Sequence, residues 1–264
     1  MALLSDFKKF LKENHDHLLR HDPTVRAFTY RIIRRLLRSE KHCLLLTEYD
    51  YHLMIVVDFE TSENLNRTEA VKIIKTYLEN APFSFPVEFA SSLVAVASSV
   101  RSNTGGSEAD KCVEADAFRH TALEILRGLC TTNYTVVAQV NGFKVMLDAV
   151  LDPLGKNGIE SKSASKDFGE EEEEAGRDLA DSIILAILFL LDEPKSRLFV
   201  RPYIDLKAIL APFVDLDTAT ERATHERRMY AKAAIVSMMR SWTGIILLTS
   251  DPECLPKLIS WLGW

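Results

Sequence analysis

The sequence has few of the features that mark enzymes, secreted proteins and membrane proteins. It has no glycine-rich phosphate or dinucleotide loop, no Gly-x-Ser-x-Gly turn and no His-Glu-x-x-His zinc motif. Its 4 cysteines are scattered without a Cys-x-x-Cys pair, a pattern typical of reduced cytosolic thiols. The longest apolar run, residues 183–191, is much shorter than the ~20 residues of a membrane-spanning helix. We therefore expect a cytoplasmic protein that is not an enzyme, needs no cofactor and does not insert into a membrane.

The sequence also lacks an excess of positive charge. Its 32 lysines and arginines are outnumbered by 38 aspartates and glutamates, which gives a net charge of −6. An acidic chain of this kind is not expected to bind nucleic acid. The N-terminus becomes charged at Asp6 and Lys8 without a long apolar stretch, so the sequence predicts no signal peptide.

Five stretches of the chain can be aligned with one another. They are residues 25–37, 66–78, 118–130, 180–192 and 229–240. Once polar insertions at 102–110 and 155–176 are set aside, the period is roughly 40–45 residues, the range of armadillo and HEAT repeats. Such repeats bury their apolar faces by stacking, and the resulting solenoids offer long surfaces to partners. The sequence therefore predicts an all-α, armadillo/HEAT-type α-solenoid of about five helical repeats.

The larger insertion divides this array. We expect N-terminal repeats over residues 1–154, a disordered acidic insertion over 155–176, and C-terminal repeats of the same solenoid over 177–264. The insertion contains five consecutive glutamates at 170–174 and few large apolar residues, so it cannot offset the entropy of ordering. Regulatory phosphorylation of Ser161, Ser163 and Ser165 is an alternative, less favoured than a tolerated loop.

The helix expected from Pro23 is the best-defined element. Asp22 can cap it, and proline fits the first helical turn. Its apolar side chains recur at helical spacing and predict the buried face; they are Val25, Phe28, Ile32 and Leu36. Residues 53–57 are β-branched enough to form a strand, but we favour a helix because no second strand candidate could pair with them.

Four arginines cover the opposite arc of this helix: Arg31, Arg34, Arg35 and Arg38. Like charges on one face repel one another unless carboxylates, phosphates or salt lie nearby. The favoured interpretation is a solvated face balanced by neighbouring acids, and the alternative is a docking site for an acidic partner. A separate cluster, His15, His17 and His21, has part of the spacing of a metal site but no clear fourth ligand, so we do not predict a metal.

The C-terminal third contains the least generic string, residues 240–246. We expect Gly244 to end the long helix that begins near Thr220, since glycine tolerates the left-handed cap conformation. Trp242 is interpreted mainly as a packing anchor at this turn. The alternative is a partner-binding hot spot, because tryptophan and arginine dominate such sites and Arg240 lies beside it.

Three motifs in a fixed order carry a resemblance to a known family. Residues 192–201, 206–213 and 240–246 are similar to the N-terminal region of the rictor and pianissimo family, with further matches at 69–74 and 93–96. The resemblance implies an armadillo-type solenoid that acts as a non-catalytic scaffold. It also implies partners, namely the target of rapamycin kinase and the other subunits of its second complex, which phosphorylates kinases of the protein kinase A, G and C class. Any membrane association would then be made through that complex.

One other class of binding protein remains open. A generic armadillo-type adaptor could bind cargo or extended peptides, but importin-like proteins repeat a tryptophan and an asparagine on successive inner helices. Here Trp242, Trp261 and Trp264 all lie near the C-terminus. The sequence therefore favours the kinase-complex scaffold over the cargo adaptor.

Overall fold

The chain is built from helices wherever its structure is described. The computed structural model describes residues 2–18, 22–61, 64–98, 109–151, 170–199, 209, 221–250, 252, 256 and 259. These residues contain twelve α-helices, two short 3-10 helices and no strand. The contacts divide the chain into two compact units, Met1–Val96 and Ala97–Trp264. The prediction of an all-α solenoid fold is confirmed; the number of repeats stays a prediction.

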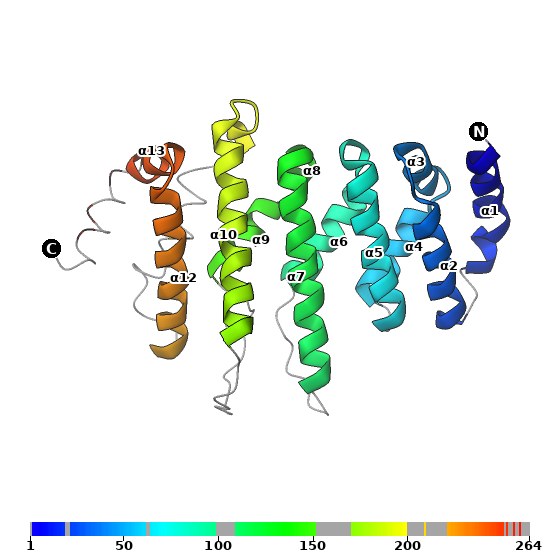
Figure 1. Ribbon diagram of the computed structural model, residues 1–264, viewed down its shortest axis with the longest axis horizontal. Helices are drawn as coiled ribbons and strands as arrows, with labels where there is room; N and C mark the ends of the chain where they lie inside the picture. The colour runs from blue at the N-terminus through cyan, green and yellow to red at the C-terminus, as the bar shows by residue number, and fades with distance from the viewer. Residues whose placement is uncertain are drawn as a thin grey trace. The chain divides into compact units, whose positions relative to one another are not determined.

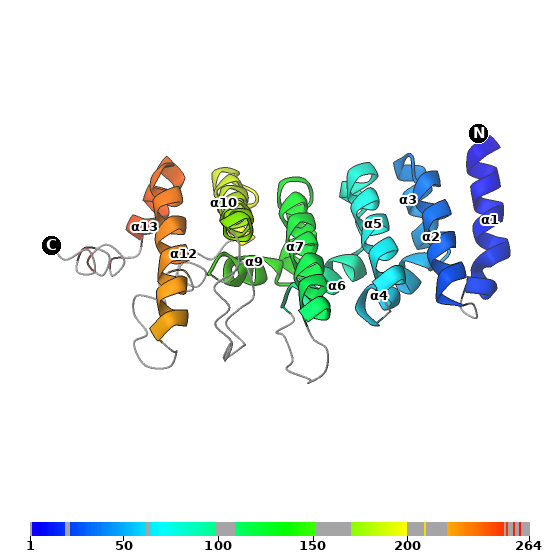
Figure 2. The same ribbon diagram turned by 60° about the horizontal axis from the view of Figure 1, so that its bottom comes forward.

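The first unit is a set of stacked helices in which α2 and α5 lie side by side (Figures 1 and 2). Its elements are α1 (Ala2–Leu18), α2 (Pro23–Leu36), α3 (Glu40–Glu48), α4 (Tyr51–Thr61), α5 (Asn64–Asn80), the 3-10 helix η1 (Pro82–Ser84) and most of α6 (Val87–Ser98). The helix α4 contains residues 53–57, so the choice of helix over strand for this segment is confirmed.

The start of α2 follows the prediction, but its buried face does not. The Thr24 amide donates to Asp22 Oδ1 at 2.8 Å, so Asp22 caps the helix, with proline in its first turn. The buried side chains are Ala27, Tyr30 and Ile33. By contrast, the predicted positions Val25 and Phe28 are 45% and 61% exposed, while Ile32 and Leu36 are half-buried. The prediction followed the largest apolar side chains, whereas the fold buries a small alanine and a tyrosine whose hydroxyl is hydrogen-bonded.

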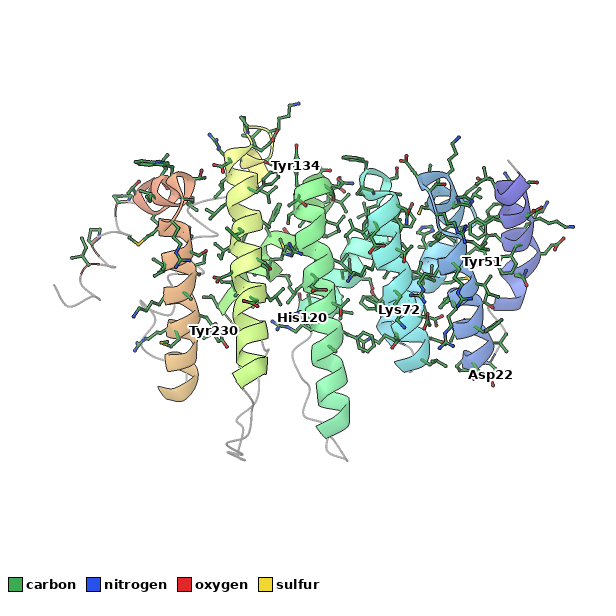
Figure 3. The ribbon with its side chains drawn as sticks, viewed as in Figure 1. Asp22, Tyr51, Lys72, His120, Tyr134 and Tyr230 are labelled. Atoms are coloured by element: carbon green, nitrogen blue, oxygen red, sulfur yellow. The ribbon has the colours of Figure 1, made fainter. Side chains whose placement is uncertain are left out.

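Aromatic side chains form much of the core of the first unit. Tyr77 meets Phe85 and Phe89 edge-on at centroid distances of 5.8 and 5.6 Å. Tyr51 is fully buried at the start of α4 (Figure 3) and donates to the Leu11 carbonyl at 2.8 Å. Edge-to-face ring pairs add about 0.5–1.5 kcal/mol beyond burial. The ring contacts join α5 to the η1–α6 segment that follows it, and the Tyr51 hydrogen bond joins α4 to α1.

The second unit repeats the arrangement with three long helices, α7, α10 and α12, where α10 packs against both of the others (Figures 1 and 2). Its remaining elements are short. The set comprises α7 (Ala109–Thr132), α8 (Tyr134–Gln139), α9 (Gly142–Leu151), α10 (Glu170–Asp192), η3 (Arg197–Phe199), α12 (Glu221–Met239) and α13 (Trp242–Ser250). Most of the apolar run in α10 is buried, but Leu185 and Phe189 are 61% and 50% exposed.

The helix α10 begins earlier than the sequence suggested. Residues 170–176 form its first turns, so the run of glutamates is helical. Glutamates are good helix formers, and negative charge in the first turn is favourable at the positive end of the helix dipole. The rest of the insertion, residues 155–169, lies outside the described residues and includes Ser161, Ser163 and Ser165. Its disorder stays a prediction.

The five aligned stretches correspond to five helices, two in the first unit and three in the second. Almost all of each stretch lies in one helix, and these helices are α2, α5, α7, α10 and α12. Within the first unit α2 contacts α5, and within the second α10 contacts α7 and α12. Each aligned stretch therefore marks one helix, and the grouping of these helices into five equivalent repeats stays a prediction.

Candidate partner-binding surfaces

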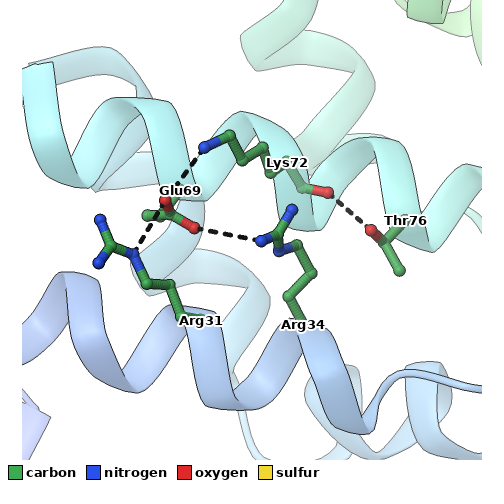
Figure 4. A network of polar contacts seen from close by, with 5 residues as sticks. All are labelled: Arg31, Arg34, Glu69, Lys72 and Thr76. Carbon is green, nitrogen blue, oxygen red and sulfur yellow. Dashed lines mark hydrogen bonds and ion pairs between the residues drawn. The ribbon is translucent and has the colours of Figure 1, made fainter.

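The arginines of α2 divide into two sets. Arg31 donates from Nε to Glu69 Oε1 of α5 at 3.1 Å, and Arg34 Nη2 lies 4.0 Å from Glu69 Oε2. Lys72, one turn along α5, donates to Glu69 Oε1 at 3.1 Å (Figure 4). We call these four residues the Glu69 cluster. It corresponds to the favoured interpretation of the basic face, in which neighbouring acids balance part of its charge.

Glu69 is unusual because its carboxylate is buried while its partners are not. Its side chain is 3% exposed, whereas those of Arg31, Arg34 and Lys72 are 49%, 36% and 43% exposed. Burial alone would raise the pKa of Glu69, but hydrogen bonds and positive charge from Lys72 and Arg31 outweigh it and hold the pKa below its ordinary value. The stabilisation from this carboxylate is therefore present above its unfolded pKa and is lost as pH falls through the folded pKa.

The other two arginines make no ion pair among the described residues. Arg35 and Arg38 are exposed, and Arg38 Nε donates to the Arg35 carbonyl at 3.2 Å. Reversing all four arginines to glutamate would therefore not be neutral for folding. At positions 31 and 34 it would place new carboxylates beside the buried carboxylate of Glu69. Arg35 and Arg38 form no ion pair with Glu69, so reversing them would not have this effect.

A second buried carboxylate in the first unit was not foreseen from the sequence. Asp58 of α4 is 1% exposed and accepts from Arg26 Nη1 at 2.7 Å and from the Tyr30 hydroxyl at 2.6 Å. Burial and the neighbouring Asp58 charge raise the pKa of Tyr30, so its hydroxyl stays protonated and donates. This Asp58 triad joins α2 to α4 and is part of the core rather than of a surface.

At the C-terminal end of the second unit, Trp242 is not the packing anchor that the sequence predicted. Its side chain is 81% exposed, and Arg240 is exposed too. Two further large apolar side chains lie nearby in the sequence. Met239, at the end of α12, is 58% exposed, and Ile246, in α13, is 64% exposed. We call these four residues the α12–α13 surface. Large apolar side chains grouped in this way often mark a protein contact.

The local geometry explains why Trp242 is exposed. The helix α12 ends at Met239, and Ser241 caps α13 by accepting from the Gly244 amide at 2.9 Å. Gly244 thus lies in the first turn of α13, and it does not end α12 as predicted. It is buried against the backbone of Met238. Glycine is required there because a side chain would collide with that backbone, and not because the position has a left-handed cap conformation. Trp242, two positions before it, begins the new helix on the outer side.

The described residues also contain a shallow hollow between α7 and α10 with a volume of about 280 Å³. Its lining includes His120 (Figure 3), Glu124, Arg127 and Asp178. His120 Nε2 lies 3.7 Å from Glu124 Oε1. These side chains are ionic and open to solvent, and they give no arrangement of a nucleophile with a base.

No metal site is formed within the described part of the chain. There, no group of three or more histidine, cysteine, aspartate or glutamate side chains is placed to hold a metal ion. The side chains of His15, His17 and His21 lie outside the described residues. Nor is any single described helix long and apolar enough to span a membrane; Arg227–Met239 and Trp242–Ser250 pass that test only together, across a 117° bend.

The stacked helices of the described residues define an all-α solenoid. The family follows from comparison with known proteins. The chain belongs to the family described as "Rapamycin-insensitive companion of mTOR, N-term", whose model matches residues 3–164 and 172–264. This confirms the resemblance seen in the sequence. The interruption of the match falls within the acidic insertion.

Curated relatives of this chain come from animals, an amoeba and a yeast. It is 28% identical to rapamycin-insensitive companion of mTOR from both Mus musculus and Homo sapiens, over 88% of this chain and 12% of each relative. It is 25% identical to protein pianissimo A of Dictyostelium discoideum, over 90% of this chain and 19% of the relative. A fission yeast protein, target of rapamycin complex 2 subunit ste20, is 26% identical over 56% of this chain and 10% of the relative. The chain thus spans less than a fifth of the length of these relatives.

Proposed function

We propose that this chain is a non-catalytic helical scaffold of the second target of rapamycin kinase complex. In that role it docks the kinase and other subunits, supports recruitment of substrates, and so serves signalling to growth and actin organisation. The family match over nearly the whole chain carries the proposal, and one relative is itself described as a subunit of this complex. The same match favours this role over a generic cargo adaptor. We place its action in the cytoplasm, with membrane association made through the complex.

The α12–α13 surface is the region of the chain best suited to a protein contact. Trp242 combines a large apolar area with few rotatable bonds, and 81% of its side chain is open to solvent. Tryptophan and arginine are enriched among the residues that dominate binding energy. We therefore propose that Trp242 and Arg240 contact the kinase or a neighbouring subunit, with Arg35 and Arg38 as a second contact on the first unit.

Replacing Trp242 and Ile246 by alanine together is expected to weaken recovery of the kinase without unfolding the chain. Hot-spot side chains of this type contribute about 2 kcal/mol or more, or about 30-fold in affinity. Both residues are exposed, so the melting temperature should stay within a few degrees of the wild type. The measurement is affinity capture of the kinase by tagged wild-type and variant chains, with circular dichroism of the purified proteins.

The control is Phe83→Ala, which removes an aromatic side chain that is 79% exposed in the first unit. It should capture the kinase as well as the wild type does. Equal capture by the Trp242 and Ile246 variant would contradict the proposed contact. A large loss of melting temperature in that variant would instead show that these side chains support the fold.

A further inference from the structure

The Glu69 cluster carries more positive charge than its own carboxylate can balance. Three basic side chains, from Arg31 and Arg34 of α2 and Lys72 of α5, surround a single buried Glu69 (Figure 4). The cluster therefore has a formal charge of +2 in a chain whose net charge is −6. Like charges held this close repel one another. A structural ion pair needs one cation, so the other two are not explained by the fold.

The cluster also has hydrogen-bond donors that Glu69 does not use. Arg31 contacts Glu69 through Nε, and the Arg34 Nη2 distance of 4.0 Å is too long for a hydrogen bond. Arg34 Nε and Glu69 Oε2 are buried, and neither has a hydrogen-bond partner among the described residues. A ligand would therefore contact the part-exposed ends of Arg31, Arg34 and Lys72. The arrangement therefore favours a further anion with several acceptor oxygens.

We propose that the Glu69 cluster binds a phosphate monoester carried on a segment of a partner protein, as phosphoserine or phosphothreonine. A phosphate ester has close to two negative charges at neutral pH and three acceptor oxygens, which matches the surplus charge and the unused donors. Guanidinium groups suit phosphate because they can donate two parallel hydrogen bonds. Glu69 holds the basic side chains in place before binding, which lowers the entropic cost of association.

The chemistry of the site selects this ligand over other anions. A carboxylate side chain would supply one negative charge and two oxygens, so it would satisfy only part of the cluster. A nucleic acid would bring many phosphates to a chain that is acidic overall, and that repulsion disfavours it. The site is formed by α2 and α5 alone. Phosphopeptide binding there therefore does not depend on the proposed role in the kinase complex.

The test is binding of a fluorescent peptide that contains one phosphoserine between neutral residues, measured by polarisation with the full chain. The phosphopeptide should bind at least about tenfold more tightly than the same peptide with serine or glutamate. Serine brings no charge and glutamate brings one charge and two oxygens, whereas the phosphate brings nearly two charges and three acceptor oxygens. Lys72→Gln should weaken phosphopeptide binding by about tenfold or more, and Lys72→Arg, which keeps the charge, should retain most of it.

The matched control is Lys41→Gln, which removes the same charge from an exposed position of α3 outside the cluster. It should change binding by less than about threefold, and thermal melts should show all three variants folded. Equal weakening by Lys72→Gln and Lys41→Gln would overturn the proposal, because binding would then follow the general positive field of the first unit. Binding of inorganic phosphate as tightly as the phosphopeptide would overturn the assignment of the ligand to a protein. Equal affinity for the serine peptide would overturn the site itself.

Discussion

Replacing Asp58 by alanine should be one of the most damaging single changes in the first unit. Asp58 is 1% exposed and holds both Arg26 and the Tyr30 hydroxyl. Its removal leaves a partly buried guanidinium and a buried hydroxyl without their acceptor, and breaking a buried ion pair costs about 3–5 kcal/mol. The expected result is a matching loss in the free energy of unfolding. Urea denaturation followed by circular dichroism measures it.

A matched variant separates the charge from the hydroxyl. Tyr30→Phe removes the hydrogen bond but leaves the ion pair of Asp58 with Arg26, so it should cost only about 1–2 kcal/mol. If Asp58→Ala proved no more harmful than Tyr30→Phe, the carboxylate would not be the centre of this network. Both residues belong to the same hydrogen-bonded network between α2 and α4, so both variants report on the same part of the core.

Gly244→Ala is expected to destabilise the junction between α12 and α13, although alanine is the better helix former. In an open helix this change would stabilise by about 1 kcal/mol. Here the new methyl group would overlap the Met238 backbone, with its carbonyl carbon at 2.7 Å and its Cα at 2.8 Å. Backbone cannot move aside like a flexible side chain, and overpacking costs about 1–3 kcal/mol or more. Hydrogen exchange should therefore accelerate in α12 and α13.

Thr249→Ala supplies the control for this change. It places alanine at an exposed position of the same helix, so only helix propensity should act and exchange should be unchanged or slower. The helices of the first unit should keep wild-type protection in both variants, since helical stacks depend mainly on nearest neighbours. A Gly244→Ala protein as stable as the wild type would show that the two helices do not approach as closely as the structure places them.

The parts of the fold that depend on local pattern could be predicted. Helical spacing identified the long helices, and the cap formed by Asp22 needed only its neighbour Thr24. Residues 53–57 were harder, since their propensity favours a strand, but the absence of a pairing partner decided correctly for α4. These features depend on residues a few positions apart.

The buried polar residues could not be predicted, because their partners are distant in the sequence. Asp58 meets Tyr30 across 28 positions, and Glu69 meets Arg31 across 38. A hydropathy pattern classes both acids as surface residues. The same limitation misplaced the buried face of α2, where Tyr30 is buried because Asp58 satisfies its hydroxyl while the larger apolar Phe28 is exposed.

The errors at the C-terminal end have a common cause. A tryptophan near a glycine suggested a packed turn, and residue type alone cannot show which side of a new helix faces the core. The cap by Ser241 sets where α13 begins, and that leaves Trp242 on the outer side with Gly244 against Met238. The three-residue spacing from Ser241 to the Gly244 amide was the signal that could have located this start.

The central claim, that this chain is a scaffold of the second target of rapamycin complex, is tested most directly by native co-purification. The chain should be tagged in its own cells, isolated under mild conditions and analysed by quantitative mass spectrometry against an untagged control. The proposed function predicts that the target of rapamycin kinase and the other subunits of that complex are enriched in near-stoichiometric amounts. Recovery of the intact, folded chain without the kinase, or with a different stable set of partners, would contradict it.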